Sequence, residues 1–312
     1  MSEFDWIARY FAPLAKSRGA AGLTDDVATL SGHAQIVTMD AIVESVHFLP
    51  DDPIDTVARK LVRVNVSDIL AKGGYPDEAL LTLGWPNTQP ETRGEDALAR
   101  FAAAFGEELE KWGISLIGGD TVGAPGGLFC ALTLTGRAAG ARAPVRRSGA
   151  QAGELIWVTG EIGAGYQGLQ EALVGGSSGA VARYRVPHIP GLEIADLIAE
   201  HATASMDVSD GLIGDLQKLL AASDCGAHLR LDAVDVFSVD DQLDLSLEEV
   251  LLKCTGGDDY QCLFTAPEAA SKAIKAAWPD ISTIGRIEAA RGLRLSWYDE
   301  MVRLPEHSAF SH

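Results

Sequence analysis

The amino-acid sequence predicts a mixed α/β fold arranged as two α/β domains. Strand-like apolar runs and helix-like stripes alternate with several hairpin-like joins, which favours mixed α/β over a simple doubly wound sheet. The length of 312 residues is sufficient for two hydrophobic cores. Composition changes over residues 136–154, which are rich in Gly, Ala and Arg, as is typical of a join between domains. We therefore expect an N-terminal domain over residues 1–139 and a C-terminal domain over residues 140–312.

The N-terminal half mixes amphipathic helices with apolar strands. Residues 3–14 place their apolar side chains at helical spacing. Residues 53–74 read as a second helix, with Asp55 as a candidate cap and the pair Gly73 and Gly74 as its stop. The other elements expected in this half are strands over residues 34–40, 80–86, 114–120 and 128–136 and a long helix over residues 93–113.

The C-terminal half continues the mixture. Its clearest helix follows the segment SMDVSDG, residues 205–211, where apolar residues recur in one stripe. That stripe consists of Leu212, Ile213, Leu216, Leu219 and Leu220. The remaining expected elements are strands over residues 155–160, 227–232, 282–287 and 293–298, and helices from about residue 167, toward residue 201 and over residues 246–254.

Bulk composition excludes several classes of protein. The formal net charge of −19 disfavours nucleic acid and anionic membranes as partners. The first residues lack a basic segment followed by an apolar core, so no secretion signal is expected, and no apolar run is long enough to span a bilayer. The four cysteines, Cys130, Cys225, Cys254 and Cys262, show no metal-ligand spacing and indicate reduced thiols in a cytoplasmic protein.

Aspartates recur at the ends of apolar elements. Asp68 differs from the others, because the helical stripe Val57, Leu61, Val64, Asp68 directs it toward the core. Lys60 or Arg63 could pair with it, and any single aspartate could be an ordinary cap or turn residue. As a set they indicate more, since converging carboxylates about 4 Å apart repel by about 4 kcal/mol per pair at an effective dielectric near 20. The set is Asp26, Asp40, Asp68, Asp120, Asp207 and Asp210.

Divalent cations would reverse that repulsion. A set of oxygen ligands without Cys or paired His favours Mg²⁺ over zinc, and several Mg²⁺ ions suggest a nucleoside triphosphate such as ATP. The chain has no Walker A loop, and the segment GEIGAG is interpreted as a plain turn. The segment IGGDT, residues 117–121, fits a phosphate better, because its glycines let backbone N–H groups approach an anion. Arg146 and Arg147 could reach phosphate or could form a solvated basic loop.

Together these motifs resemble a known family. In order along the chain they are TDD, VTMDAIVESVHF, VNVSDILAKGG.P, LIGGDT, RSGAQAGELIWVTG.IG....GL, MDVSDGL..DL and TGGDDYQCLFT. The set is similar to the thiamine-monophosphate kinases, within the aminoimidazole ribonucleotide synthetase-like superfamily. The resemblance runs from the first predicted helix to beyond Thr265, although SDGL alone marks the whole superfamily.

The resemblance implies a two-domain fold, a homodimer formed through the N-terminal domains, and ATP-dependent phosphorylation of thiamine monophosphate. It implies Mg²⁺ ligands at Asp26, Thr38, Met39, Asp40, Asp68, Asp120, Asp207 and Asp210. It implies ATP contacts at Gly119, Asp120, Arg147 and Ser209, and substrate contacts at His47, Asp258 and a C-terminal residue, either His307 or Phe310.

The chemistry of this acceptor asks for no general base. A phosphate monoester with a second pKa near 6 is already largely a dianion at neutral pH. What opposes reaction is repulsion between two polyanions, which cations would lower. We therefore expect catalysis by metal ions and positioning, with Asp210 and Arg147 as the side chains that would assist.

Three positions depart from the family pattern. Thr24 stands where the family has Gly, Met39 where it has Thr, and Asp258 where it has Glu. These departures keep open an ATP-dependent ligase or cyclase of the same superfamily that acts on another phosphorylated substrate. The net charge alone leaves a non-catalytic cation-binding protein as a third hypothesis. Asp215, five residues after Asp210, receives no role from the sequence.

Overall fold

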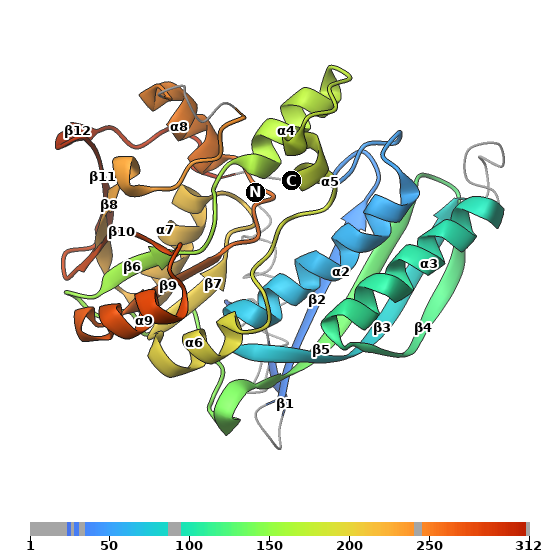
Figure 1. Ribbon diagram of the computed structural model, residues 1–312, viewed down its shortest axis with the longest axis horizontal. Helices are drawn as coiled ribbons and strands as arrows, with labels where there is room; N and C mark the ends of the chain where they lie inside the picture. Colours follow the sequence, from blue (N-terminus) through green and yellow to red (C-terminus); the bar gives the residue numbers. More distant parts are fainter. Residues whose placement is uncertain (1–23, 26–27, 31–34, 87–94, 240–244, 310–312) are drawn as a thin grey trace.

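A computed structural model of the chain describes residues 24–25, 28–30, 35–86, 95–239 and 245–309 (Figure 1). Two β-sheets lie side by side, each with its own helices. The mixed α/β prediction is confirmed. The chain passes from the first sheet to the second between Ala138 and Leu155, and the predicted boundary between residues 139 and 140 falls in this connection. No helix in the described part of the chain is long and apolar enough to cross a bilayer.

The N-terminal sheet has the strand order β1-β2-β5-β3-β4. Its strands are β1 (Ala28–Leu30), β2 (Gln35–Val43), β3 (Gly74–Pro86), β4 (Ser115–Ala124) and β5 (Phe129–Ala138). β3 and β4 are parallel, and the other pairs are antiparallel. The structure extends the third of these strands back to Gly74, because its first residues pair with β5 directly after the helix stop. The predicted helix over residues 3–14 lies outside the described residues.

Helices α2 (Ile54–Ala71) and α3 (Glu95–Trp112) cover one face of this sheet (Figure 1). α2 is the central helix of the molecule, because it contacts β2 and β5 on one side and β7 and β9 of the second sheet on the other. The helix therefore buries residues around most of its circumference. Asp55 lies in its first turn but does not cap it, since Pro53 occupies the N-cap position. Gly73 ends it with a φ of 68°, a conformation that glycine adopts without strain.

The C-terminal sheet has the order β12-β11-β8-β10-β6-β9-β7. Its strands are β6 (Leu155–Val158), β7 (Ala204–Asp207), β8 (Gly226–Arg230), β9 (Cys262–Ala266), β10 (Ser282–Glu288), β11 (Gly292–Trp297) and β12 (Glu300–Val302). The β8–β11 pair is parallel and the other pairs are antiparallel. β7 lies at the edge nearest α2, so the aspartate that ends it faces the N-terminal domain.

The helices of this half are α4 (Ala164–Leu173), α5 (Gly179–Arg185), α6 (Ile194–His201), α7 (Leu212–Ser223), α8 (Leu247–Thr255) and α9 (Ser271–Ala277). Short 3₁₀ turns occur at Ala139–Ala141, Leu231–Ala233 and Glu268–Ala270. α7 confirms the helix predicted from the leucine stripe, whose members are buried. The sequence did not predict α5 or α9, each of seven residues, because so short a helix shows little periodicity.

Candidate active site

α2 and β2 together position the first carboxylates. The side chain of Asn65 on α2 accepts a hydrogen bond from the backbone N–H of Asp40, at 2.9 Å, and so fixes the end of β2 against the helix. One turn further along α2, Asp68 is only 7% exposed, as the helical stripe predicts. The hydroxyl of Thr38, which β2 directs to the same side, donates to Oδ2 of Asp68. Thr38, Asp40 and Asp68 thus lie on the helix-covered face of the N-terminal sheet.

β7 brings a carboxylate from the other domain to this place. Asp207 ends the strand, is buried, and accepts a hydrogen bond from the hydroxyl of Ser67 on α2 at 2.7 Å. The neighbouring residues Ser67 and Asp68 therefore bring the carboxylate of Asp207, from the C-terminal domain, close to the carboxylate of Asp68 itself. The sequence segment VNVSD supplies both interactions from consecutive residues of one helix.

These carboxylates disfavour one another's charge. Burial, and then the charge of Asp210, raises the pKa of Asp40 to about 6. Burial raises the pKa of Asp207 to about 6 although the Ser67 hydroxyl opposes the shift. Burial, followed by the charges of Asp207 and Asp40, raises the pKa of Asp68 well above its usual value. Burial and mutual repulsion therefore both oppose the charges of these three carboxylates.

Such a donor set fits Mg²⁺ held jointly by protein and phosphate. The described residues contain no group of three or more His, Cys, Asp or Glu placed to hold a metal ion by themselves. Mg²⁺ in nucleotide enzymes commonly takes one or two carboxylates, several waters and substrate phosphates, so a closed protein cage is not needed. The mutual repulsion of Asp40, Asp68 and Asp207 is what a bound divalent cation would relieve.

A buried lysine lies beside the carboxylates. Nζ of Lys72, at the C-terminal end of α2, donates to the carbonyl of Ser205 at 2.6 Å and lies 3.1 Å from Oδ1 of Asp25. The other oxygen of Asp25 accepts the backbone N–H of Arg147 at 3.1 Å. This chain of contacts ties the TDD loop to the connection between the domains. Asp26, the member of that loop expected to bind metal, lies outside the described residues.

Asp215 organises the turn that carries Asp210. Its Oδ2 accepts the backbone N–H groups of Ser209 and Asp210 at 2.9 and 3.0 Å, and its Oδ1 lies 2.7 Å from Nζ of Lys218. Lys218 also pairs with the carboxylate of Asp210. Gly211 stands at the N-cap position of α7, so Asp210 is not an ordinary cap residue. The residue that the sequence left unassigned thus holds two candidate ligands in place.

A second polar cluster, which we call the Lys60 cluster, lies at the other end of the interface and consists of Lys60, His47, Asp258, Tyr260 and Tyr184. Nζ of Lys60 donates to the carbonyl of His47 at 2.9 Å and to Oδ2 of Asp258 at 2.8 Å. The hydroxyl of Tyr260 donates to the other oxygen of Asp258 at 3.0 Å. The same lysine lies 4.4 Å from the centre of the Tyr184 ring. Every charge in this cluster has an opposite charge or a polar partner.

One cavity of about 420 Å³ joins the two groups of residues. Part of its wall is apolar and aromatic, from Ile42, Val64, Tyr166 and Leu169, as is usual for sites that bind small organic molecules. Of the residues that the sequence singled out, six line it: Asp40, His47, Ser209, Asp210, Asp258 and His307. Carboxylates therefore lie at one part of the cavity and the Lys60 cluster at another.

Other predicted residues lie elsewhere. Gly119 and Asp120 are on β4, three strands from Asp40 across the order β2-β5-β3-β4. At about 4.8 Å per strand the separation is about 14 Å. Asp120 is the register partner of Thr82, and its side chain lies on the face of the sheet that no helix of the described residues covers. Met39 is the register partner of Thr133, and its exposed side chain lies on the same face. Within one chain, neither the Asp120 carboxylate nor the Met39 side chain meets the other candidate ligands. The role that the resemblance implies for Met39 is through its main-chain carbonyl, which lies between Thr38 and Asp40 on β2.

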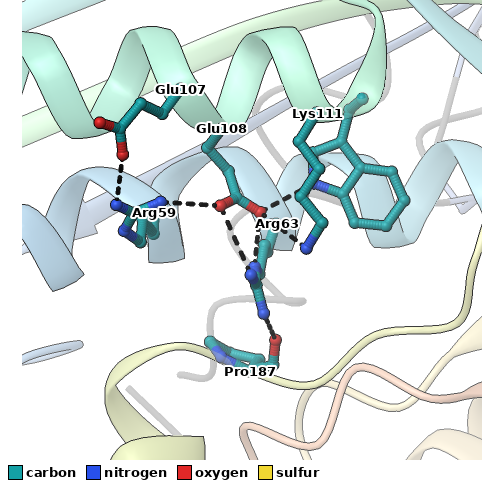
Figure 2. Close-up of polar contacts among 7 residues, drawn as sticks. Arg59, Arg63, Glu107, Glu108, Lys111 and Pro187 are labelled. Atoms are coloured by element: carbon teal, nitrogen blue, oxygen red, sulfur yellow. Dashed lines mark hydrogen bonds and ion pairs between the residues drawn. The ribbon is translucent and has the colours of Figure 1, made fainter.

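The predicted partners of Asp68 also need correction. Lys60 pairs with Asp258, and Arg63 pairs with Glu108 on α3, with its Nε 2.7 Å from the carboxylate. Figure 2 shows this second network, in which Arg63 also donates to the carbonyl of Pro187 in the other domain. Burial tends to raise the pKa of Glu108, but hydrogen bonds from Arg63 and then Trp112 outweigh it and hold this pKa below its usual value.

The lysines of the site received little from the sequence, which offered Lys60 only as a possible partner of Asp68 and gave Lys72 and Lys218 no role. Lys60, Lys72 and Lys218 each pair with a carboxylate at the cavity or beside it. A lysine within the apolar stripe of a helix, as Lys60 is, is a usable signal, because a buried ammonium requires a partner. Nothing local in the sequence identifies Asp258, 198 residues away, as that partner.

Comparisons with known proteins agree with this architecture. Residues 24–138 match the family described as AIR synthase related protein, N-terminal domain, and residues 151–298 match its C-terminal domain. A thiamine-monophosphate kinase of Caulobacter vibrioides is 37% identical, over 94% of this chain and 86% of the relative. The thiamine-monophosphate kinase of Escherichia coli is 36% identical, over 85% of this chain and 83% of the relative.

A solved structure described as AaThiL complexed with AMPPCP and TMP superimposes with a TM-score of 0.83 at 26% identity, covering 100% of this chain and 97% of that one. The thiamine-monophosphate kinase of Stenotrophomonas maltophilia superimposes with a TM-score of 0.75 at 27% identity, covering 92% and 96%. The two sheets, the carboxylates at their interface and the similarity to these relatives agree, and the chain belongs to the thiamine-monophosphate kinase family.

Proposed function

We propose that this protein transfers the γ-phosphoryl group of ATP to thiamine monophosphate, giving thiamine diphosphate and ADP. The single observation that carries the proposal is the cavity, which joins interface carboxylates suited to a metal-bound polyphosphate with the Lys60 cluster and an aromatic wall suited to an organic cation. The relative AaThiL, solved with AMPPCP and TMP, supports the same pair of ligands.

The residues of this chain divide the work by position. Thr38, Asp40, Asp68, Asp207 and Asp210 would hold Mg²⁺, which when bound offsets the charge of the phosphates. Asp215 holds the backbone of Ser209 and Asp210 in one orientation. Asp25 holds the backbone N–H of Arg147 in the connection between the domains, and the Arg147 side chain would contact the nucleotide.

No general base is needed in this scheme. The acceptor phosphate is largely a dianion at neutral pH, so its oxygen can attack without losing a proton. His47, Asp258 and His307 line the cavity and would orient the acceptor. The protein then contributes alignment and charge compensation, which are the main components of catalysis in phosphoryl transfer.

The direct test is product analysis. Purified protein with ATP, Mg²⁺ and thiamine monophosphate should form thiamine diphosphate, identified by mass spectrometry, and the Asp68→Asn variant should form almost none. Folded protein that makes no thiamine diphosphate would contradict the proposal. A screen of other phosphorylated acceptors with the same protein tests the runner-up, an ATP-dependent ligase or cyclase, which the departure at Asp258 keeps open.

We further propose that the protein is a homodimer joined through the uncovered face of its N-terminal sheet. That face exposes Met39, Leu80 and Val122, of which Met39 is 60% exposed, and apolar patches of this kind commonly mark interfaces. Asp120 lies on the same face, about three strands from the other carboxylates. Because Asp120 does not meet the other candidate ligands within one chain, we propose that it acts in the site of the second copy.

Complementation between two inactive variants tests this arrangement. If Asp120 acts in the partner's site, co-refolded Asp68→Ala and Asp120→Ala chains should recover about a quarter of wild-type activity, since about half of the dimers are mixed and each has one intact site. If Asp120 acts in its own chain, the mixture stays inactive. Sedimentation of each variant alone provides the control, because both must still be dimeric.

A further inference from the structure

The Lys60 cluster contains a residue to which the motif set assigns no role. Lys60 lies in the middle of α2 with its side chain 1% exposed, and it does not line the cavity. Its ammonium group contacts residues that line the cavity. A lysine buried to this degree costs free energy unless its charge and its hydrogen bonds are satisfied, and here they are.

The contacts of Lys60 cross the domain interface. It donates to the carbonyl of His47, in the turn after β2 of the N-terminal domain, and to Asp258 of the C-terminal domain. Both of these residues line the cavity, as does Tyr184, whose ring lies beneath the same ammonium. One atom, Nζ, therefore sets the positions of three parts of the cavity wall that are distant in sequence.

The two segments that Lys60 joins are themselves constrained. Nδ1 of His47 accepts the backbone N–H of Val43 at 3.0 Å, which closes the turn and fixes the ring. Asp258 has a φ of 69°, and its N–H donates to the carbonyl of Ser209 at 2.9 Å. Each segment is rigid within its own domain, so the remaining freedom is the position of one segment relative to the other. Lys60 restricts that freedom at the cavity wall, because it contacts both segments directly.

We infer that Lys60 is a positioning residue for the thiamine half of the site: it holds His47 and Asp258 at a fixed separation across the domain interface. The inference rests on the proposed function. The acidic end of the cavity, where nucleotide phosphates would bind, receives no contact from Lys60. The effect of losing Lys60 should therefore fall on the acceptor and leave the nucleotide largely unaffected.

The test is a separation of KM values in the full-length enzyme. Lys60→Met keeps the length and burial of the side chain but removes the ammonium. It should raise KM for thiamine monophosphate by about tenfold or more, because misplaced substrate contacts are costly, while KM for ATP stays within about twofold. Isothermal titration with thiamine monophosphate and no ATP should show the same weakening.

Two further variants separate positioning from general damage. Arg59→Met, one residue earlier on α2, removes a cation that pairs with Glu107 of α3 and touches no cavity residue, so both KM values should stay at wild type (Figure 2). Lys60→Gln retains an NH₂ group that can donate to both oxygens. Its KM for thiamine monophosphate should be at least about threefold lower than that of Lys60→Met. If Lys60→Met fails to fold, Lys60→Gln is compared with the wild type instead.

The outcomes are distinct. Equal changes in both KM values, or a Lys60→Met enzyme that matches Arg59→Met, would overturn the inference while the wild type remains an active kinase. A wild-type protein that neither binds thiamine monophosphate nor forms thiamine diphosphate overturns the proposed function instead. A rise in KM for thiamine monophosphate alone in Lys60→Met, which is smaller in Lys60→Gln, supports the positioning role.

Discussion

Two buried lysines of α2, Lys60 near the middle of the helix and Lys72 at its C-terminal end, lie in opposite electrostatic settings. Around Lys60, the single carboxylate of Asp258 has both a cation and a tyrosine hydroxyl as partners. Around Lys72, acids outnumber cations, and burial together with mutual repulsion raises the pKa values of Asp68 and Asp207. The comparison shows that the protein neutralises the charges at one end of its cavity with its own side chains, whereas the carboxylates at the other end require a bound cation.

The largest effect on activity should come from a substitution at the carboxylate end of the cavity, which depends on a bound cation. Asp68→Asn removes a charge that is costly in the metal-free protein but is needed to hold Mg²⁺. We expect kcat to fall by about a thousandfold, equivalent to about 4 kcal/mol, while the melting temperature without Mg²⁺ rises. Steady-state kinetics and thermal denaturation in EDTA measure the two effects. A variant that is both inactive and less stable without metal would show that Asp68 has a structural role.

The pH dependence of metal-free stability should carry the same signature. The pKa values of Asp40 and Asp207 are raised from 3.8 to about 6, so the folded state binds more protons than the unfolded state between these values. Their stabilising contribution is complete below about pH 3.8 and is lost as the pH rises through about 6. Each two-unit shift corresponds to about 3 kcal/mol at most.

Denaturant titrations in EDTA at pH 5 and pH 7.5 measure this loss, and the Asp207→Asn variant should show a smaller difference between the two pH values. Added Mg²⁺ should stabilise the wild type at pH 7.5 and have little effect at pH 5, where protons already neutralise the carboxylates. Equal stabilisation by Mg²⁺ at both pH values would contradict a cation site built from these groups.

A smaller effect should follow from removing the cation that the chain itself supplies. Lys72→Met leaves Asp25 without its ion pair and the carbonyl of Ser205 without its donor. We expect the metal-free protein to lose about 2 kcal/mol of unfolding free energy, since a buried charge loses its partner. Millimolar Mg²⁺ should recover part of the loss. The corresponding loss in Lys60→Met should not respond to Mg²⁺, and a response there would erase the contrast between the two ends.

The smallest effect is expected for Asp258→Glu, which installs the residue usual for the family. Glutamate is less suited than aspartate to the φ of 69° at this position, so the melting temperature should fall by an amount equivalent to about 0.5–1 kcal/mol. KM for thiamine monophosphate should change by less than about threefold, because Lys60 and Tyr260 can still pair with the longer carboxylate. A tenfold change in KM would mean that the reach of this carboxylate, and not its pairing, sets substrate affinity.

Local patterns predicted much of the fold and part of the site. The stripe of α7 and the glycine stop of α2 depend on nearest neighbours in the chain, and both are present. The burial of Asp68 followed from its place in the stripe of α2. Asp215 received no role, because its partners are backbone N–H groups, which every sequence has and no pattern of side chains reveals.

The sequence by itself determined most of the longer helices and strands, the ordered motif set, and hence the family. Only the tertiary structure decided which charges meet: Lys60 with Asp258, Arg63 with Glu108, Lys72 with Asp25. It also separated Asp120 from the other carboxylates by three strands. The physical reason is that helix and strand periodicity is set by residues a few positions apart, whereas the partner of a buried charge is chosen by packing between segments that can lie far apart along the chain.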